Sequence, residues 1–397
     1  MKRFITYIFA VMLLSGCTVG NGEGTYAESA LNSLTIKVVY PDDYSDYDKS
    51  GMSLSIKDID YSNSYSTTVD SAGEATVRLS NGRYIIQFSG KHDDELFNAT
   101  ADNVLLSDAD CSVELTAIVS KAGAIIIKEI YCGGCSKAPE EGTYQFDKYI
   151  ILHNNSAEVT YLDGLCFGML SPYNSTGTNK WSGDEYASVA VLADAVWQFG
   201  GDGTSFPLEP GEDAVVCQNG AIDHSAAYPL SVNLNKEGYF VLYSPTLFTN
   251  TSYHPAPGDQ ISVDRYLSVV QKYGQSNAWA FSNSSPAPLI FRPDGITIEE
   301  HLALESSINT TEKVAFIPVE WVLDGVEVYN GSSTSNTKRF SSEIDAGYVT
   351  QSTTYSGVSL YRNVDQENSE LYGYEVLMDT NNSTVDFYEL SEASLHE

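Results

Sequence analysis

Basic residues are scarce in this sequence. Lysine and arginine number 21, against 53 aspartates and glutamates, for a formal net charge of −32 at neutral pH. Lys2 and Arg3 are the only charged residues before Cys17, so the remaining chain carries 19 basic and 53 acidic residues, a balance of −34. Such a field repels nucleic-acid phosphates and anionic lipid head groups. We therefore expect no nucleic-acid partner.

Cysteines and long apolar runs are also few. Six cysteines in 397 residues exclude a small scaffold held together by disulfides. No apolar run of about 18 residues follows the N-terminal segment, so we expect no membrane-spanning helix. Hydrophobic residues still make up 42% of the chain, which is enough for packed cores. The length suggests two or three domains.

The N-terminal segment predicts export. Lys2 and Arg3 precede a short apolar stretch, which is typical of a signal peptide over residues 1–16. The tetrad Leu14-Ser15-Gly16-Cys17 resembles a bacterial lipobox. The resemblance implies cleavage before Cys17, diacylglycerol on its sulfur and N-acylation, with palmitate as the expected chain. Several acyl chains would anchor the protein to a membrane stably. An ordinary secretory signal is the alternative.

The residues after Cys17 bear on the location of the protein. Residues 17–32 are polar and glycine-rich without periodicity, which indicates a flexible tether. Thr18 stands where an aspartate favours inner-membrane retention, so we expect lipid anchoring in the outer membrane. Glu23 is the one acid near the lipidated cysteine, and this leaves both the cell surface and the periplasmic face open.

Alternating apolar residues predict strands over residues 33–120. Leu34, Ile36 and Val38 share one face of a segment, and the same period recurs several times between turn-forming clusters. No helical period competes, which favours a small immunoglobulin-like β-sandwich. Residues 70–90 resemble the prealbumin-like, carboxypeptidase-regulatory-like modules of exported bacterial proteins. That resemblance implies a spacer.

A possible modification site lies in this first domain. Asp70-Ser71-Ala72 resembles the sequon for O-glycosylation of exported proteins in gut anaerobes, which implies a glycan on Ser71. Asp and Ser before Gly73 also favour a turn. A turn is compatible with a glycan, so both interpretations stay open.

The strand pattern restarts over residues 121–397, which resemble a lamin-tail-like β-sandwich. The resemblance is carried by Lys128-Glu129-Ile130, residues 147–156, Leu162-Asp163-Gly164-Leu165, Leu208-Glu209-Pro210-Gly211 and residues 379–387. It implies a larger β-sandwich. The proline-containing, irregular region between residues 245 and 316 predicts long loop insertions, where binding residues usually concentrate.

The same segment is similar to a family of outer-membrane lipoproteins of Gram-negative gut anaerobes with a domain of unknown function. The phrases YLDGLC, VEWVLDGVEV, EIDAGY and DTNNSTVDF carry this resemblance. It implies a role at the outer membrane and an association with TonB-dependent receptors, which is not a mechanism.

Cys132-x-x-Cys135 is the sharpest local motif. Tetrahedral zinc would need two further ligands, and the sequence shows no second such pair. A redox pair should precede a helix, whereas the context here is β. We therefore favour a local disulfide between Cys132 and Cys135 over a metal site.

In the Asx-rich C-terminal motif, Asn381 and Asn382 predict a locked strand end, with calcium ligation by Asp379, Asn381 and Asp386 as the weaker alternative.

Recognised catalytic motifs are absent from the sequence. It contains no Gly-x-Ser-x-Gly, no His-Glu-x-x-His and no phosphate-binding glycine loop. We predict no catalytic residues, no metal site and no cofactor. His153 lies in an expected strand, and the simplest interpretation is a solvent-facing or hydrogen-bonded core position.

Aromatic residues are abundant, with 27 tyrosines and four tryptophans. Those in expected loops are candidates for binding a glycan, a peptide or a receptor, because rigid rings stack at low entropic cost. They are Tyr173, Trp181, Tyr186, Tyr253, Tyr266 and Tyr273.

The favoured function is a non-enzymatic binding or accessory lipoprotein, with a TonB-dependent transporter as a possible partner. A glycan-directed hydrolase using carboxylates and a surface adhesin are the alternatives.

Overall fold

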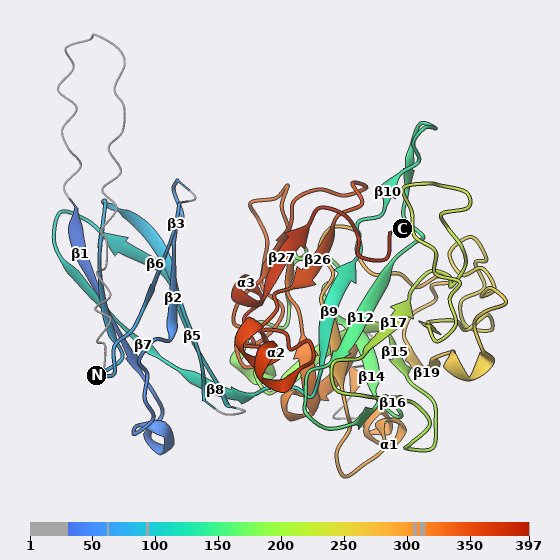
Figure 1. The fold of residues 1–397 in the computed structure, drawn as a ribbon, viewed down its shortest axis with the longest axis horizontal. Coiled ribbons are helices and arrows are strands. Elements are labelled where there is room, and N and C mark those ends of the chain that lie inside the picture. The colour runs from blue at the N-terminus through green and yellow to red at the C-terminus, as the bar shows by residue number, and fades with distance from the viewer. Residues whose placement is uncertain (1–30, 62, 93–94, 305–307, 310–313, 397) are drawn as a thin grey trace, which may run out of the picture.

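The computed structural model describes residues 31–61, 63–92, 95–304, 308–309 and 314–396. The expected signal peptide, Cys17 and nearly all of the tether lie outside these residues. The protein is mostly β, as predicted, and its two parts lie side by side along the long axis (Figure 1). No helix in the described part of the chain is long and apolar enough to cross a membrane.

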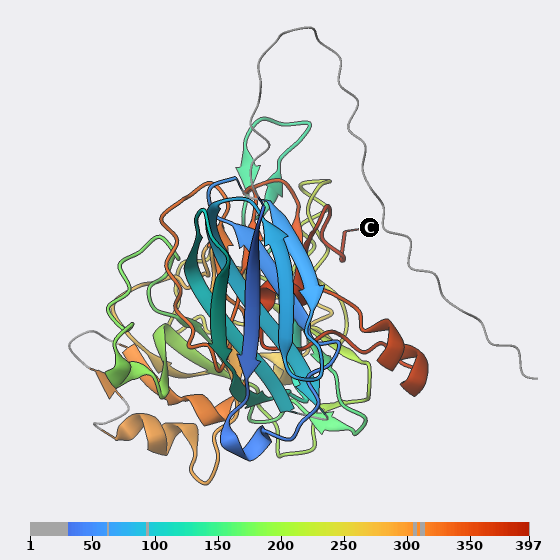
Figure 2. The same ribbon diagram turned by 90° about the vertical axis from the view of Figure 1, so that its left-hand side faces the viewer.

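The first domain packs two sheets face to face. A three-stranded sheet has the order β4-β1-β7, and a five-stranded sheet has the order β3-β2-β5-β6-β8 (Figure 2). Leu34, Ile36 and Val38 alternate inward as expected and pack against Ile56 and Phe88 of the second sheet. The strands are β1 (Asn32–Val39), β2 (Ser53–Asp58), β3 (Ser64–Thr68), β4 (Glu74–Leu79), β5 (Gly82–His92), β6 (Glu95–Leu106), β7 (Cys111–Thr116) and β8 (Ile118–Lys121), and a short 3-10 helix, η1, spans Asp42–Tyr44.

The predicted turn at Ser71 is present. Asp70 Oδ1 accepts hydrogen bonds from the backbone amides of Ala72 and Glu74, each at 2.9 Å, and Ser71 is exposed between β3 and β4. The Asx side chain therefore explains the local sequence without a modification.

The second domain is a larger sandwich. One sheet has the order β18-β17-β12-β9-β26-β27, and the other has the order β21-β22-β15-β14-β20-β23, with β19 pairing to β15. The strands of the first sheet are β9 (Ile125–Tyr131), β12 (Tyr149–Asn154), β17 (Asp213–Cys217), β18 (Phe240–Val241), β26 (Ser359–Arg362) and β27 (Phe387–Leu390). Those of the second are β14 (Cys166–Leu170), β15 (Val189–Gln198), β19 (Ser268–Lys272), β20 (Pro288–Phe291), β21 (Ile308–Asn309), β22 (Val314–Pro318) and β23 (Val322–Gly325).

Short elements complete the domain. The remaining strands form two-stranded pairs: β10 (Cys135–Ser136) with β11 (Thr143–Tyr144), β13 (Thr160–Tyr161) with β16 (Pro207–Leu208), and β24 (Val328–Asn330) with β25 (Val349–Gln351). The helices are α1 (Ile298–Ala303), α2 (Gln366–Tyr372), α3 (Ser383–Asp386), η2 (Asp184–Tyr186), η3 (Val263–Arg265) and η4 (Val319–Trp321). Thr297 and Glu300 form a capping box that starts α1.

The two large sheets are covered on both faces. Ile127 of β9 and Trp197 of β15 belong to the core between the sheets. Helix α1 contributes Ile298 and Leu302 to a second core on the outer face of the seven-stranded sheet. A third core covers the outer face of β12 and β17. Burial on both faces explains why β9 opens with three successive isoleucines, Ile125 to Ile127, rather than with an alternating pattern.

A buried ion cluster joins the C-terminal strands to this sandwich. Arg362 Nη2 lies 2.5 Å from Asp324 Oδ2, and Nη1 lies 3.1 Å from Asp379 Oδ1 and 3.4 Å from Asp386 Oδ2. The carboxylates of Asp379 and Asp386 therefore form ion pairs with the Arg362 guanidinium, which argues against calcium ligation by these residues. Asn382 instead caps α3, its side chain accepting from the Thr384 amide at 3.1 Å.

Candidate functional site

Two of the six aromatic residues singled out from the sequence come together. Trp181 and Tyr186 lie in the loop between β14 and β15, with ring centroids 5.1 Å apart and nearly perpendicular planes. Tyr173, in the same loop, is 46% exposed. The loop thus carries three of the six aromatic binding candidates.

Local hydrogen bonds fix the position of Trp181. Its backbone amide donates to Asn179 Oδ1 at 2.9 Å, and its indole Nε1 donates to Ser171 Oγ at 3.2 Å. Asn179 Nδ2 donates in turn to the carbonyl of Lys338 at 2.9 Å, which ties the loop to a segment far along the chain. The indole is thus held in one orientation without being buried.

Phe316 supports the two rings from below. It lies on β22, opposite Val191 of β15 in the sheet register. Its ring centroid is 5.8 Å from that of Trp181 and 5.9 Å from that of Tyr186. All three rings are half-buried, so part of each aromatic surface stays accessible. The sheet therefore provides a rigid base for aromatic side chains that come from a loop.

We call the adjoining cavity of about 290 Å³ the Trp181 pocket. Its lining mixes polar and apolar side chains, and its charged residues are Asp184, Lys338 and Arg339, the last paired with buried Glu327. Ser341 Oγ is buried and has no hydrogen-bond partner within the described residues. The lining comprises Leu170, Ser171, Asn179, Trp181, Ser182, Gly183, Asp184, Tyr186, Ala187, Val189, Val191, Lys338, Arg339, Phe340 and Ser341.

Sequence reasoning missed the far side of this pocket. Lys338 and Ser341 line it, and Phe316 packs against the Trp181 ring, all from segments more than a hundred residues beyond Trp181. Phe316 sits in an alternating strand and is a plausible strand residue, but no local signal indicates its pairing with the 171–188 loop. Only the sheet order brings these residues together.

The other three aromatic candidates lie elsewhere, and Tyr273 is a correction. It is buried in the core under α1, where burial raises its pKa above the ordinary value, so it is no binding residue. It directly follows β19, which pairs antiparallel with β15, and this position at the end of a sheet strand explains the burial. Tyr253 packs edge-to-face on Phe146, and Tyr266 on Tyr243, at 4.9 and 5.6 Å, so neither joins the Trp181 pocket.

The expected disulfide is also corrected. Cys132 and Cys135 are free thiols and point to different partners. Cys132 Sγ donates to Gln351 Oε1 at 2.6 Å, and Cys135 Sγ donates to Asp147 Oδ2 at 3.5 Å. Burial raises the pKa of each thiol to about 12, which leaves both protonated and unreactive at neutral pH.

Titratable groups near these thiols serve the fold. Lys148 is buried, and its Nζ donates to the Phe281 carbonyl at 2.7 Å; burial lowers its pKa to about 8. His153 occupies a hydrogen-bonded core position, with Nδ1 2.7 Å from Asp213 Oδ1 and Nε2 3.0 Å from the Glu375 carbonyl. No group of three or more potential metal ligands occurs among the described residues.

Comparison with known proteins places the chain in a structural context. Residues 209–394 match the model of a family described as "Protein of unknown function (DUF4876)". A DUF4876 family protein from Bacteroides thetaiotaomicron VPI-5482 has a similar fold, with a TM-score of 0.57, 25% identity, and coverage of 90% of this chain and 94% of that chain. The chain is similar to DUF4876 proteins over most of its length. This confirms the expected resemblance to a domain of unknown function from gut bacteria.

More distant structures add little. DUF3823 family proteins from Parabacteroides merdae ATCC 43184 and Bacteroides ovatus ATCC 8483 each share 12% identity, with TM-scores of 0.19 and 0.18. They cover 36% and 47% of this chain and 67% and 79% of their own. Comparison with curated proteins gave no match.

Proposed function

We propose that the protein is a non-enzymatic binding module that holds an uncharged, polyhydroxylated ligand, such as a glycan, in the Trp181 pocket. The observation that carries the proposal is the contrast between this pocket and the rest of the molecule. The chain as a whole is strongly acidic. The pocket instead combines two accessible aromatic rings with neutral polar groups, the charges of Asp184 and Lys338, and the guanidinium of Arg339, which is paired with buried Glu327.

Sugar chemistry fits this combination. Sugar rings present apolar C–H faces that stack on indole and phenol rings, and hydroxyls that pair with amides and other hydroxyls. Asn179, Ser182 and Ser341 supply such polar partners around Trp181 and Tyr186. The Ser341 hydroxyl lacks a partner among the described residues, and a ligand hydroxyl would supply one. Because Ser171 and Phe316 preorganise the rings, little entropy is lost on binding.

The membrane attachment belongs to the same proposal. The lipobox resemblance supports a lipid anchor on Cys17 in the outer membrane, facing either the cell surface or the periplasm. The first domain would then act as a spacer that holds the pocket away from the bilayer. Delivery of the captured ligand to a TonB-dependent transporter is the corresponding accessory role, and it is supported by the family resemblance alone.

A glycan array with the purified protein, followed by calorimetric titration of the best oligosaccharide, tests the proposal. Trp181→Ala should weaken binding at least about tenfold, the usual scale for a central aromatic contact. Tyr266→Ala is the matched control, since it removes a half-buried aromatic residue with one edge-to-face partner outside the pocket. Equal binding by both variants would contradict the proposal. Release of cleaved sugar, lost on one carboxylate substitution, would favour the hydrolase instead.

A further inference from the structure

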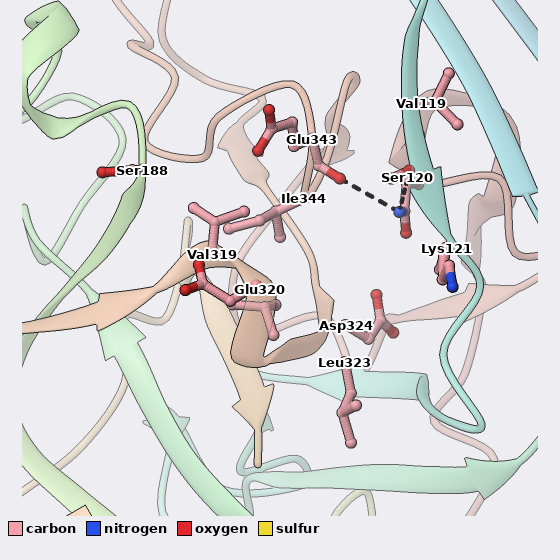
Figure 3. Close-up of a pocket in the computed structure, with 12 residues that line it drawn as sticks. Val119, Ser120, Lys121, Ser188, Val319, Glu320, Leu323, Asp324, Glu343 and Ile344 are labelled. Atoms are coloured by element: carbon pink, nitrogen blue, oxygen red, sulfur yellow. Dashed lines mark hydrogen bonds between the residues drawn. The ribbon is translucent and has the colours of Figure 1, made fainter. Parts of the chain in front are cut away.

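A second cavity, of about 360 Å³, lies where the two domains meet (Figure 3). Val119, Ser120 and Lys121 of β8 form its first-domain wall. The opposite wall comes from the second domain, from η4, β23 and the segment around Ile344. Interdomain cavities are common places for small-molecule sites. This cavity is separate from the Trp181 pocket and shares no lining residue with it.

Hydrogen bonds between the domains hold the walls in place. Asn381 Nδ2 donates to Ser120 Oγ at 2.8 Å and to the Glu343 carbonyl at 3.3 Å (Figure 3). Asn382 Nδ2 donates to Ser89 Oγ at 2.9 Å, and Asn98 Nδ2 donates to the Thr380 carbonyl at 2.5 Å. The cavity is therefore a preformed feature of the two-domain arrangement rather than a gap left by a loose joint.

The linker also fits tightly beside this cavity. A Cβ added at Gly123 would lie 2.4 Å from the Leu323 carbonyl oxygen, a distance that real Cβ atoms do not reach. The Gly123 amide donates to Asp379 Oδ2 at 3.2 Å. A glycine is thus needed where the chain passes from the first domain to the second, and this close passage limits interdomain movement.

The lining of the cavity combines apolar walls with an excess of negative charge. Val119, Val319, Val322, Leu323 and Ile344 provide the carbon surface. Glu320, Asp324 and Glu343 contribute three carboxylates against the single ammonium of Lys121, a balance of −2. Such a site attracts a positive group and offers apolar surface to the carbon atoms attached to it.

Asp324 is the most informative of these carboxylates. It is 3% exposed, yet it lines the cavity, and Figure 3 shows its side chain among the other lining residues, next to Leu323. Both of its hydrogen bonds, from the Ile127 amide at 2.7 Å and from Arg362 at 2.5 Å, use Oδ2. This leaves Oδ1 available to a donor inside the cavity. A buried carboxylate oxygen gains most from such a donor when the donor is charged.

We propose that the interdomain cavity binds a small organic cation, an ammonium or guanidinium group carried on a short apolar chain or ring. The positive group lies against Asp324 and Glu343, and the carbon chain lies along the valine and isoleucine side chains. Because both domains line the cavity, a bound ligand stabilises their mutual arrangement by mass action. The inference does not depend on the glycan proposal.

Titration of the full protein with hexylammonium chloride tests this, read by calorimetry and by the melting temperature. We expect saturable binding and a rise in melting temperature, with 1-hexanol and hexanoate as neutral and anionic controls. Glu320→Gln with Glu343→Gln should weaken hexylammonium binding about tenfold, because both side chains are exposed and each contributes modestly. Val319→Trp, which fills the half-exposed wall, should abolish it.

The controls separate a site from a general charge effect. Glu367→Gln with Glu370→Gln makes the same change in net charge on the exposed surface of α2, and it should leave hexylammonium binding unchanged. Trp181→Ala should also leave it unchanged, so failure here is distinct from failure of the glycan proposal. Absence of saturable binding, equal binding of 1-hexanol, or an equal loss in the α2 variant would each overturn the inference.

Discussion

Replacing Arg362 with methionine removes a cation that pairs with three buried carboxylates. The Arg362 side chain is 2% exposed, and its Nε also donates to the Ile127 carbonyl at 2.8 Å. Methionine keeps most of the apolar volume but leaves Asp324, Asp379 and Asp386 without their counter-charge. Loss of one partner from a buried ion pair costs about 3–5 kcal/mol, so we expect the variant to lose at least this much stability at about pH 8.

The loss should shrink as the pH falls. Burial raises the pKa of Asp324 to about 6 and that of Asp386 to about 7, above the ordinary value of 3.8. The protonated forms are therefore favoured in the folded protein. Their contribution to stability is complete below about pH 4 and is lost as the pH rises through 6 and 7. At about pH 5 two of the three carboxyls are mainly neutral, so the variant strands less buried charge and should lose less stability than at about pH 8.

Urea unfolding followed by tryptophan fluorescence, at about pH 8 and pH 5, measures both losses. Arg292→Met is the matched control, because its guanidinium donates to the carbonyls of Asp163 and Tyr161, both at 2.6 Å. Since that substitution strands no buried carboxylate, its cost should change little with pH. A loss in Arg362→Met that is the same at both pH values would refute the reasoning.

Three further predictions follow from single sites. Asp163 lies behind the 201–206 turn. Burial by itself would raise the pKa of its carboxyl, but hydrogen bonds from the Ser205, Phe206 and Gly203 amides outweigh this effect and lower the pKa below 3.8. Asp163→Asn should therefore cost about 1–3 kcal/mol at neutral pH in urea unfolding, and the cost should fade as the pH drops below the ordinary value. Thiol titration without reductant should find Cys132 and Cys135 unreactive in the native protein and fully reactive in denaturant; oxidised cysteines in denaturant would restore the disulfide hypothesis. Cys17→Ala should release the protein from the membrane fraction with an unchanged melting temperature, and retention after a carbonate wash would contradict the lipid anchor.

The sequence predicted those parts of the fold that depend on local patterns. Leu34, Ile36 and Val38 alternate because β1 has one buried face, and the apolar run at Ile125 reflects a strand buried on both faces. Strand pairing over long distances leaves no such local signal. The ion pair of Arg362 with Asp324 and the ring contact of Trp181 with Phe316 both depend on the sheet order.

The candidate site was predicted in part for the same reason. Loop aromatics could be recognised from composition, and Trp181 and Tyr186 do line a pocket. Tyr273 was misjudged because the irregular region between residues 245 and 316 contains β19, which joins the sheet beside β15 and is followed directly by Tyr273 in a core. A tyrosine is common both in strands and in binding loops, so its residue type does not separate the two.

The pairing of β9 with β26 has a consequence for how the chain acquires its structure. All strand pairs of the first sandwich lie within residues 32–121, so that domain can form once this segment is available. In the second domain, Ile130 pairs with Leu360, 230 residues further on (360 − 130). The sheet that contains β9 therefore lacks a partner along one edge of β9 until nearly the whole polypeptide has been synthesised. We expect a truncation before β26 to leave a stable first domain joined to an aggregation-prone second one.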